Sequence, residues 1–316
     1  MEFFVILTAW LLLQWRGPGS ALHRDQWLHY WYLRAGDALG ALPVTVRLLL
    51  VLLLPALLIA LLTLLVKPLL GGVALFALEL LVLTYALGRG DFNAQLDAYL
   101  ERWQRGDLEA AYREALRSGT LHAQTAARSD RAAPEQTEAV AVDSTHIDDG
   151  AALHREMCAA VAYSGFERWF AVVFWFAALG PAAALFYRLL QLLSRNGNDS
   201  HLSAAENVLI ARWLFWAEWL PARLLGLAFA VTGNFAACFR RWRERLFETE
   251  PTPALLAGYV GQALEVMAPA MRAAVQPSNR PLFIATAAVE LNELRDLLRR
   301  SAICWLVALA LLQLIG

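Results

Sequence analysis

The sequence predicts an all-α, polytopic helical integral membrane protein with cytoplasmic helical segments, and three observations support this fold class. Of the 316 residues, 59% are hydrophobic and 17% are charged, whereas about 25% of residues are charged in a typical soluble domain. The apolar residues are gathered in runs that match the ~30 Å thickness of a bilayer's hydrocarbon core. No run alternates with a period of two residues, so no strand is expected.

The first two apolar runs predict a transmembrane hairpin over residues 44–87. Residues 44–66 contain a single charge, Arg47, near one end, and residues 69–87 contain a single acid, Glu79. A two-residue connection separates the runs, which forces the second helix to turn back along the first.

Residues 166–239 are predicted to hold further transmembrane helices. The run 170–193 contains the Gly180-Pro181 pair, and the run 208–239 is interrupted by Pro221. The second of these runs also contains three charged residues, which predicts a helix packed inside a bundle more than one facing lipid. These residues are Arg212, Glu218 and Arg223.

The two ends of the chain are apolar but short. Residues 1–43 predict an uncleaved N-terminal anchor and a cytoplasmic amphipathic segment, because no basic residues precede the first apolar run. Residues 301–316 predict a transmembrane or interfacial helix. The chain is therefore expected to cross the membrane four to six times.

Arginine-rich stretches between the runs indicate which side faces the cytoplasm. By this criterion residues 88–165 and 240–300 are cytoplasmic and helical, with a mobile loop at about 120–149, where large apolar residues are scarce. In the helix over 91–104 the apolar residues have helical spacing, and Asp107 is placed to cap the next helix. The spaced residues are Leu96, Tyr99, Leu100 and Trp103.

Ionisable residues inside apolar runs are the first candidates for a binding site, because an unpaired charge in hydrocarbon costs at least ~2.5 kcal/mol. One hypothesis is a polar cavity in which Arg223 binds an anionic ligand, while Glu79 or Glu218 acts as hydrogen-bond acceptor or base. The alternative is a buried Glu–Arg pair that fixes the register of the helices.

Arg89 and Asp91 form a second candidate, at the membrane surface after the hairpin. In Gly88-Arg89-Gly90-Asp91 they are placed to hold a phosphate and a metal ion. Alternatively, Arg89 is a membrane anchor and Asp91 caps a helix. The segment lacks the lysine of a P-loop.

The remaining chemistry is sparse. The three cysteines are far apart without a CxxC or Cys/His spacing typical of zinc sites, and the six histidines show no ligand spacing. We therefore expect no metal and no cofactor. The 27 basic and 28 acidic residues give a net charge of −1, which argues against a nucleic-acid partner.

Three passages resemble the AmpE family of inner-membrane proteins, which is related to the CobD/CbiB family of cobalamin biosynthesis. The first is Gly88-Arg89-Gly90-Asp91 with the later Arg105–Ala111, and the others are Phe170–Arg188 and Trp219–Leu224. The CobD-like elements within them are Gly180-Pro181, Tyr187-Arg188 and Pro221-Ala222-Arg223.

The AmpE resemblance implies a modulator of β-lactamase induction in cell-wall stress signalling, located in the inner membrane. Its expected partners are membrane lipid, a small anionic ligand such as a muropeptide or a nucleotide, and a protein of the same signalling route. The residues expected to bind the ligand are Glu79, Arg89, Asp91, Arg188, Glu218 and Arg223.

An enzyme remains an alternative. The CobD/CbiB relation implies a nucleotide-dependent, amide-forming enzyme that uses Mg-ATP. The chain lacks that family's N-terminal Asp-Pro segment and its Gly-Arg-Asp-Thr stretch, which argues against this activity. A third possibility is a scaffold whose cytoplasmic helices bind a soluble protein.

Overall fold

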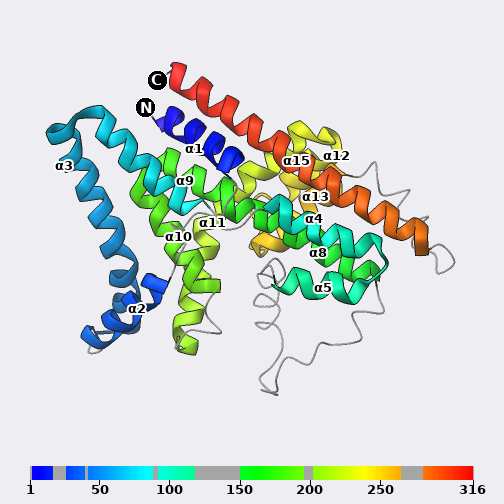
Figure 1. Cartoon of the computed structure of the whole chain (residues 1–316), viewed down its shortest axis with the longest axis horizontal. Coiled ribbons are helices and arrows are strands. Elements are labelled where there is room, and N and C mark those ends of the chain that lie inside the picture. The colour runs from blue at the N-terminus through cyan, green and yellow to red at the C-terminus, as the bar shows by residue number, and fades with distance from the viewer. Residues whose placement is uncertain are drawn as a thin grey trace. The chain divides into compact units, whose positions relative to one another are not determined.

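A computed structural model describes residues 2–16, 26–39, 42–87, 92–117, 150–195, 202–264 and 280–315. Throughout these ranges every element is helical and no strand is present, which confirms the predicted all-α class (Figure 1). Among the described residues, three helices are long and apolar enough to cross a membrane: Val44–Leu69, Ala204–Thr232 and Arg280–Ile315. Arg89, Asp91 and the predicted mobile loop 120–149 lie outside the described residues.

The chain forms two compact units. The first comprises Met1–Gly90, Glu167–Pro221 and Leu306–Gly316. The second comprises Asp91–Phe166 and Ala222–Trp305. Two long helices, α11 (Ala204–Thr232) and α15 (Arg280–Ile315), contribute residues to both units.

In the first unit, α10 packs against α3 and α9, and α1 packs against the same two helices. The elements are α1 (Glu2–Arg16), α2 (Gln26–Ala38), α3 (Val44–Ala86), η2 (Phe166–Phe170), α9 (Ala171–Leu179) and α10 (Pro181–Arg195).

Helix α3 bends sharply at Gly71, whose φ of 79° and ψ of −177° lie in a region that is essentially restricted to glycine. Two limbs, coloured blue and cyan in Figure 1, meet at this bend. The bend lies a few residues after the connection predicted at Lys67-Pro68, and Pro68 itself is inside the helix.

The predicted run 170–193 is not one spanning helix. Gly180, with φ 85° and ψ −172°, ends the 9-residue α9, and Pro181 starts the 15-residue α10. At ~1.5 Å per residue these helices measure about 14 Å and 22 Å, and both are shorter than the ~30 Å hydrocarbon core.

Helix α11 continues through Pro221 but ends at Thr232, so the predicted run 208–239 is divided between α11 and α12 (Phe235–Arg245), which Asn234 caps. As predicted, α11 is more buried than the other candidate spans. In its most apolar 18-residue window 56% of the residues are buried, against 17% and 22% for the other two candidate spans. Helix α15 joins the end of the predicted cytoplasmic segment 240–300 to the predicted C-terminal helix 301–316 in one helix of 36 residues. Its charged residues all precede Ser301, so its apolar part is the C-terminal end.

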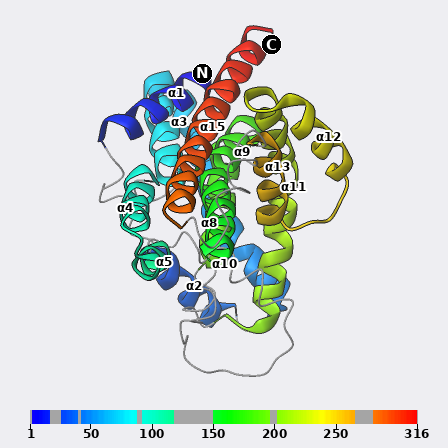
Figure 2. The same cartoon turned by 90° about the vertical axis from the view of Figure 1, so that its right-hand side faces the viewer.

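In the second unit, α4 (Phe92–Gln104) packs on α5 (Leu108–Arg117), and α13 (Thr252–Ala263) packs on α8 (Gly150–Gly165) and on α12 (Phe235–Arg245). Figure 2 shows the α4–α5 pair and the α12–α13 pair. The predicted apolar face of α4 is buried: Leu96, Tyr99, Leu100 and Trp103.

Local chemistry explains the joint between α4 and α5. Gly106 has a φ of 78°, and the carboxylate of Asp107 accepts a hydrogen bond from the Ala110 amide at 2.9 Å. This is the predicted N-cap. The indole of Trp103 donates to the carbonyl oxygen of Ile284 at 3.1 Å, which joins α4 to α15.

Candidate functional site

The predicted site residues that the structure describes lie on three helices. Glu79 is half-buried in the second limb of α3. Arg188 in α10, and Glu218 and Arg223 in α11, are each 3% exposed.

Arg188 belongs to a buried polar network in the first unit. Its guanidinium donates to the side-chain oxygen of Gln191 at 2.6 Å, and the Gln191 amide donates to the carboxylate of Glu167 at 2.6 Å. Arg195, which lies one helical turn after Gln191 on α10, forms an ion pair with the same carboxylate. The network thus connects α10 to η2, and Glu167 was not among the predicted residues.

Arg168 adds a third guanidinium beside this carboxylate. Arg168 is 9% exposed, and its guanidinium interacts electrostatically with Glu167, Arg195 and Arg188. We call these five residues the arginine cluster: Glu167, Arg168, Arg188, Gln191 and Arg195. The Arg195 side chain is 26% exposed, so the cluster reaches the surface at that end.

Glu218 accepts a hydrogen bond from the hydroxyl of Tyr187 at 3.1 Å. Tyr187 precedes Arg188 in α10, so Glu218 links α11 to the helix that forms the arginine cluster. In the same part of the unit, the indole of Trp175 donates to the carbonyl oxygen of Ala217 at 3.1 Å, which joins α9 to α11.

Arg223 is held by backbone oxygens in the second unit. Its guanidinium donates to the carbonyl oxygens of Leu246 at 2.7 Å and Glu248 at 2.6 Å. The Trp242 indole donates in turn to the carbonyl oxygen of Arg223 at 2.7 Å. These contacts fasten the chain that follows α12 to α11, so Arg223 has a structural role beside its predicted ligand-binding one.

Glu206, which the sequence analysis did not single out, is a buried carboxylate of the first unit with partners on three segments of the chain. It accepts from Tyr32 in α2 at 3.0 Å, pairs with Arg47 in α3, and accepts from the amide and hydroxyl of Ser203 at 2.8 Å. Ser203 and Glu206 form a capping box at the start of α11. The Ser-x-x-Glu pattern preceding an apolar run is the signal that could have identified it.

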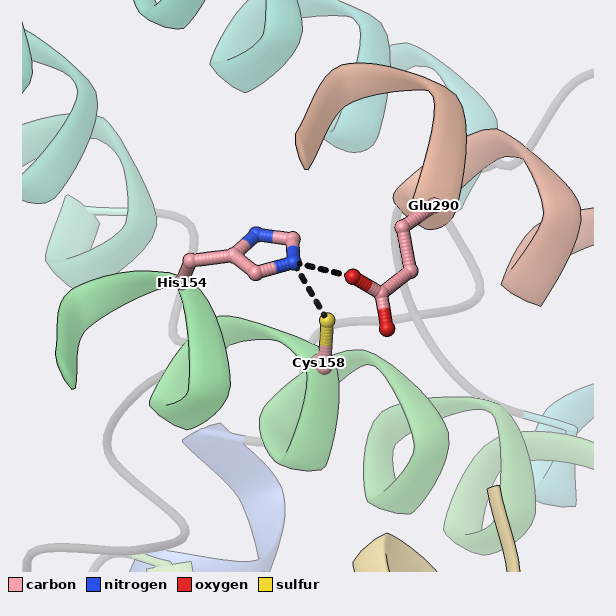
Figure 3. Close-up of side chains that lie close together, drawn as sticks. All are labelled: His154, Cys158 and Glu290. Atoms are coloured by element: carbon pink, nitrogen blue, oxygen red, sulfur yellow. Dashed lines mark hydrogen bonds and ion pairs between the residues drawn. The ribbon is translucent and has the colours of Figure 1, made fainter. Parts of the chain in front are cut away.

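A second group that sequence analysis missed lies in the second unit and comprises His154, Cys158 and Glu290 (Figure 3). The Nε2 atom of His154 is 2.9 Å from the Glu290 carboxylate and 3.5 Å from the Cys158 sulfur. His154 and Cys158 are one turn apart on α8, and Glu290 reaches them from α15. The prediction considered the loop spacings of zinc sites and overlooked this i, i+4 pair.

Aromatic side chains flank the histidine of this group. The His154 ring lies 5.9 Å from the ring of Trp103 and 6.3 Å from that of Phe283. Burial, with a smaller contribution from the Glu290 carboxylate, raises the pKa of the Cys158 thiol well above its usual range. The thiol of the metal-free protein is therefore neutral and a poor nucleophile.

The described residues thus define an all-α membrane protein with a buried arginine cluster in one unit and a His–Cys–Glu group in the other. No protein-family model and no solved structure matches the chain.

Comparison with curated proteins supports a distant relation to the CobD/CbiB proteins. The chain is similar to the cobalamin biosynthesis protein CobD of Chromobacterium violaceum, with 30% identity over 127 residues. The match covers 38% of this chain and 39% of that protein, so it spans about two fifths of the relative's length. The narrower resemblance to AmpE receives no support from the comparisons and stays a prediction.

Proposed function

We propose that the protein is a multi-pass protein of the bacterial inner membrane that modulates the response to cell-wall stress, as the AmpE resemblance implies. In this proposal it binds a small anionic ligand, such as a muropeptide, or an anionic lipid, and transmits the bound state to a protein partner. The observation that favours the proposal is the arginine cluster. There Arg195 pairs with the Glu167 carboxylate, Arg188 is linked to it through Gln191, and Arg168 interacts electrostatically with all three charged groups.

The chemistry of the cluster favours an anion. Guanidinium groups bind carboxylates and phosphates with paired, charge-assisted hydrogen bonds, which are roughly twice as strong as neutral ones. Burial strengthens such contacts, because the local dielectric is lower than that of water. Arg188, a predicted ligand-binding residue, lies at the buried end of the cluster, and Arg195 lies at its exposed end.

The test compares Arg188→Gln with Arg212→Gln in a strain whose β-lactamase induction depends on this protein. Arg212 is exposed on α11 and serves as the matched control. We expect Arg188→Gln to abolish induction while Arg212→Gln leaves it intact, at equal amounts of protein in the membrane. Normal induction with Arg188→Gln would overturn the assignment of the ligand to this cluster.

The similarity to CobD favours a second candidate, a nucleotide-dependent enzyme that forms amide bonds. Arg89, Asp91 and Arg223 would then contact the substrates, with Mg-ATP as the nucleotide. The purified protein in detergent is tested with Mg-ATP in a thermal-shift assay. A stabilisation that disappears in Arg89→Ala or Asp91→Ala would support the enzyme, and the absence of any shift would remove it.

A further inference from the structure

We propose that His154, Cys158 and Glu290 bind a divalent transition-metal ion of the zinc type in the second unit. The proposal concerns residues outside the arginine cluster and is independent of the proposed function. It rests on the positions of the three ligand atoms, on their chemistry and on the surroundings of the group.

The positions of the ligand atoms suit a tetrahedral ion. One ligand atom from each residue lies within 4.8 Å of the other two. Zinc–ligand bonds of ~2.3 Å to sulfur and ~2.0–2.1 Å to nitrogen and oxygen place tetrahedral S···N and N···O neighbours about 3.6 Å and 3.3 Å apart. The observed S···N separation of 3.5 Å already fits, and the N···O separation of 2.9 Å needs to widen by a few tenths of an ångström.

The donor set selects the class of ion. An imidazole nitrogen, a thiolate sulfur and a carboxylate oxygen suit zinc and its neighbours, whereas magnesium and calcium prefer oxygen ligands alone. His154, Cys158 and Glu290 each supply one ligand atom of this kind. Three protein ligands leave the fourth tetrahedral position to water or to an external donor, the arrangement of catalytic zinc sites.

The surroundings orient the ligands toward one point. His154 is 3% exposed, and its Nδ1 atom has no hydrogen-bond partner in the part of the chain that the structure describes. The polar contacts of the ring are therefore made through Nε2, the atom that faces Cys158 and Glu290 (Figure 3). The Glu290 side chain is 21% exposed and gives an ion a route from solvent.

When the ion binds, the sulfur of Cys158 exchanges its bond to hydrogen for a bond to the metal. The S–H bond of Cys158 breaks as the metal–sulfur bond forms, and the proton leaves to solvent. No electron is transferred. The hydrogen bond between Nε2 of His154 and the Glu290 carboxylate is exchanged for two bonds to the ion. The proton of this hydrogen bond leaves to solvent while Nδ1 takes up a proton, so the metal-bound imidazole is neutral.

The experiment uses the full-length protein in detergent, stripped with a chelator and titrated with Zn²⁺ and, separately, with Co²⁺ as a spectroscopic probe. We expect one ion per chain and a thiolate-to-cobalt absorption band. Cys158→Ser should eliminate the band and lower Zn²⁺ affinity by at least about tenfold, and His154→Gln should weaken binding similarly. Cys304→Ser is the matched control, because Cys304 is the other partly exposed free cysteine, and it should bind as the wild type does.

The wild-type spectrum decides the matter even if a variant fails to fold. Absence of a thiolate–cobalt band in the folded wild-type protein would overturn the proposal, as would unchanged Zn²⁺ affinity in Cys158→Ser. In either case the three residues form a hydrogen-bonded group that only stabilises the contact of α8 with α15. Neither result would affect the induction test of the arginine cluster.

Discussion

Glu114 in α5 is a buried carboxylate whose charge is balanced by arginines from two helices. Its carboxylate pairs with Arg117 at 2.8 Å and with Arg102 of α4 at 3.1 Å. The hydrogen bond from Arg117 lowers the pKa of Glu114, burial opposes this, and the charges of Arg102 and Arg117 lower it further. A carboxyl whose pKa is lower in the folded state stabilises that state above its unfolded pKa, and this stabilisation is lost as the pH falls.

Glu114→Gln should therefore destabilise the α4–α5 pair at pH 7, by about 1 kcal/mol. The difference from the wild type should shrink as the pH falls below about 4.3, the ordinary pKa of glutamate. The loss of stability is measured by hydrogen exchange of the α5 backbone amides in the two proteins as a function of pH. Glu109→Gln is the control, because Glu109 forms an exposed pair with Arg113 and its loss should cost less. Equal effects of the two substitutions would contradict the role given to Glu114.

Gly226 shows how closely α11 and α13 approach. A Cβ atom at this position would lie 2.4 Å from the Tyr259 ring, whereas at Gly261 it would meet nothing within 4 Å. Gly226→Ala should cost about 1–3 kcal/mol through overpacking, and Gly261→Ala should be neutral or stabilising by up to about 1 kcal/mol. Thermal unfolding in detergent compares the stability of the two variants with that of the wild type. A Gly226→Ala protein as stable as the wild type would mean that Tyr259 moves freely.

At the scale of elements, two glycines determine where apolar runs bend. Gly71 and Gly180 both combine a positive φ with a ψ near 180°. Other residues reach this region at a cost of about 1–3 kcal/mol. Gly71→Ala and Gly180→Ala should each lower the unfolding temperature, whereas the neighbouring Gly72→Ala should not, because the positive-φ glycines of the described chain do not include Gly72. If Gly72→Ala lowered the unfolding temperature as much as Gly71→Ala, the effect would come from helix packing and not from the backbone conformation of Gly71.

The helical elements could largely be predicted from the sequence, and their bends could not. The spacing of Leu96, Tyr99 and Trp103 identifies a buried helical face because helical periodicity is local. The bend of α3 was expected beside Pro68, but Pro68 is helical and the bend depends on the conformation of Gly71. Composition alone does not reveal which of several glycines adopts a positive φ.

The candidate sites could be predicted only in part, because tertiary packing brings together residues that are distant in the sequence. Arg188 was recognised as an ionisable residue in an apolar run, but its connection to Glu167 depends on how α10 lies against η2. The His154–Cys158 pair is visible as an i, i+4 spacing on one helix. Glu290 lies 136 residues away from His154, and only tertiary packing brings it to the pair.

At the scale of the whole molecule, the predicted topology places the connection near Lys67 outside the cytoplasm and the segment near Arg243 inside it. Both positions are exposed. In a protein without its native cysteines, a membrane-impermeant thiol reagent added to spheroplasts should label Lys67→Cys and spare Arg243→Cys. Inside-out vesicles should give the reverse. Labelling of both positions from one side would contradict the predicted orientation.

The capping box of α11 has a consequence for the order of events during synthesis. Arg47 emerges from the ribosome 159 residues before Glu206, the carboxylate with which it pairs. Until Glu206 has been synthesised, Arg47 lacks this partner, and its long side chain can keep the charge in water at a membrane surface. The contact that fixes α2 and α3 against α11 therefore forms late in biogenesis, and a ribosome stalled before Glu206 would hold a chain in which α2 and α3 lack that contact.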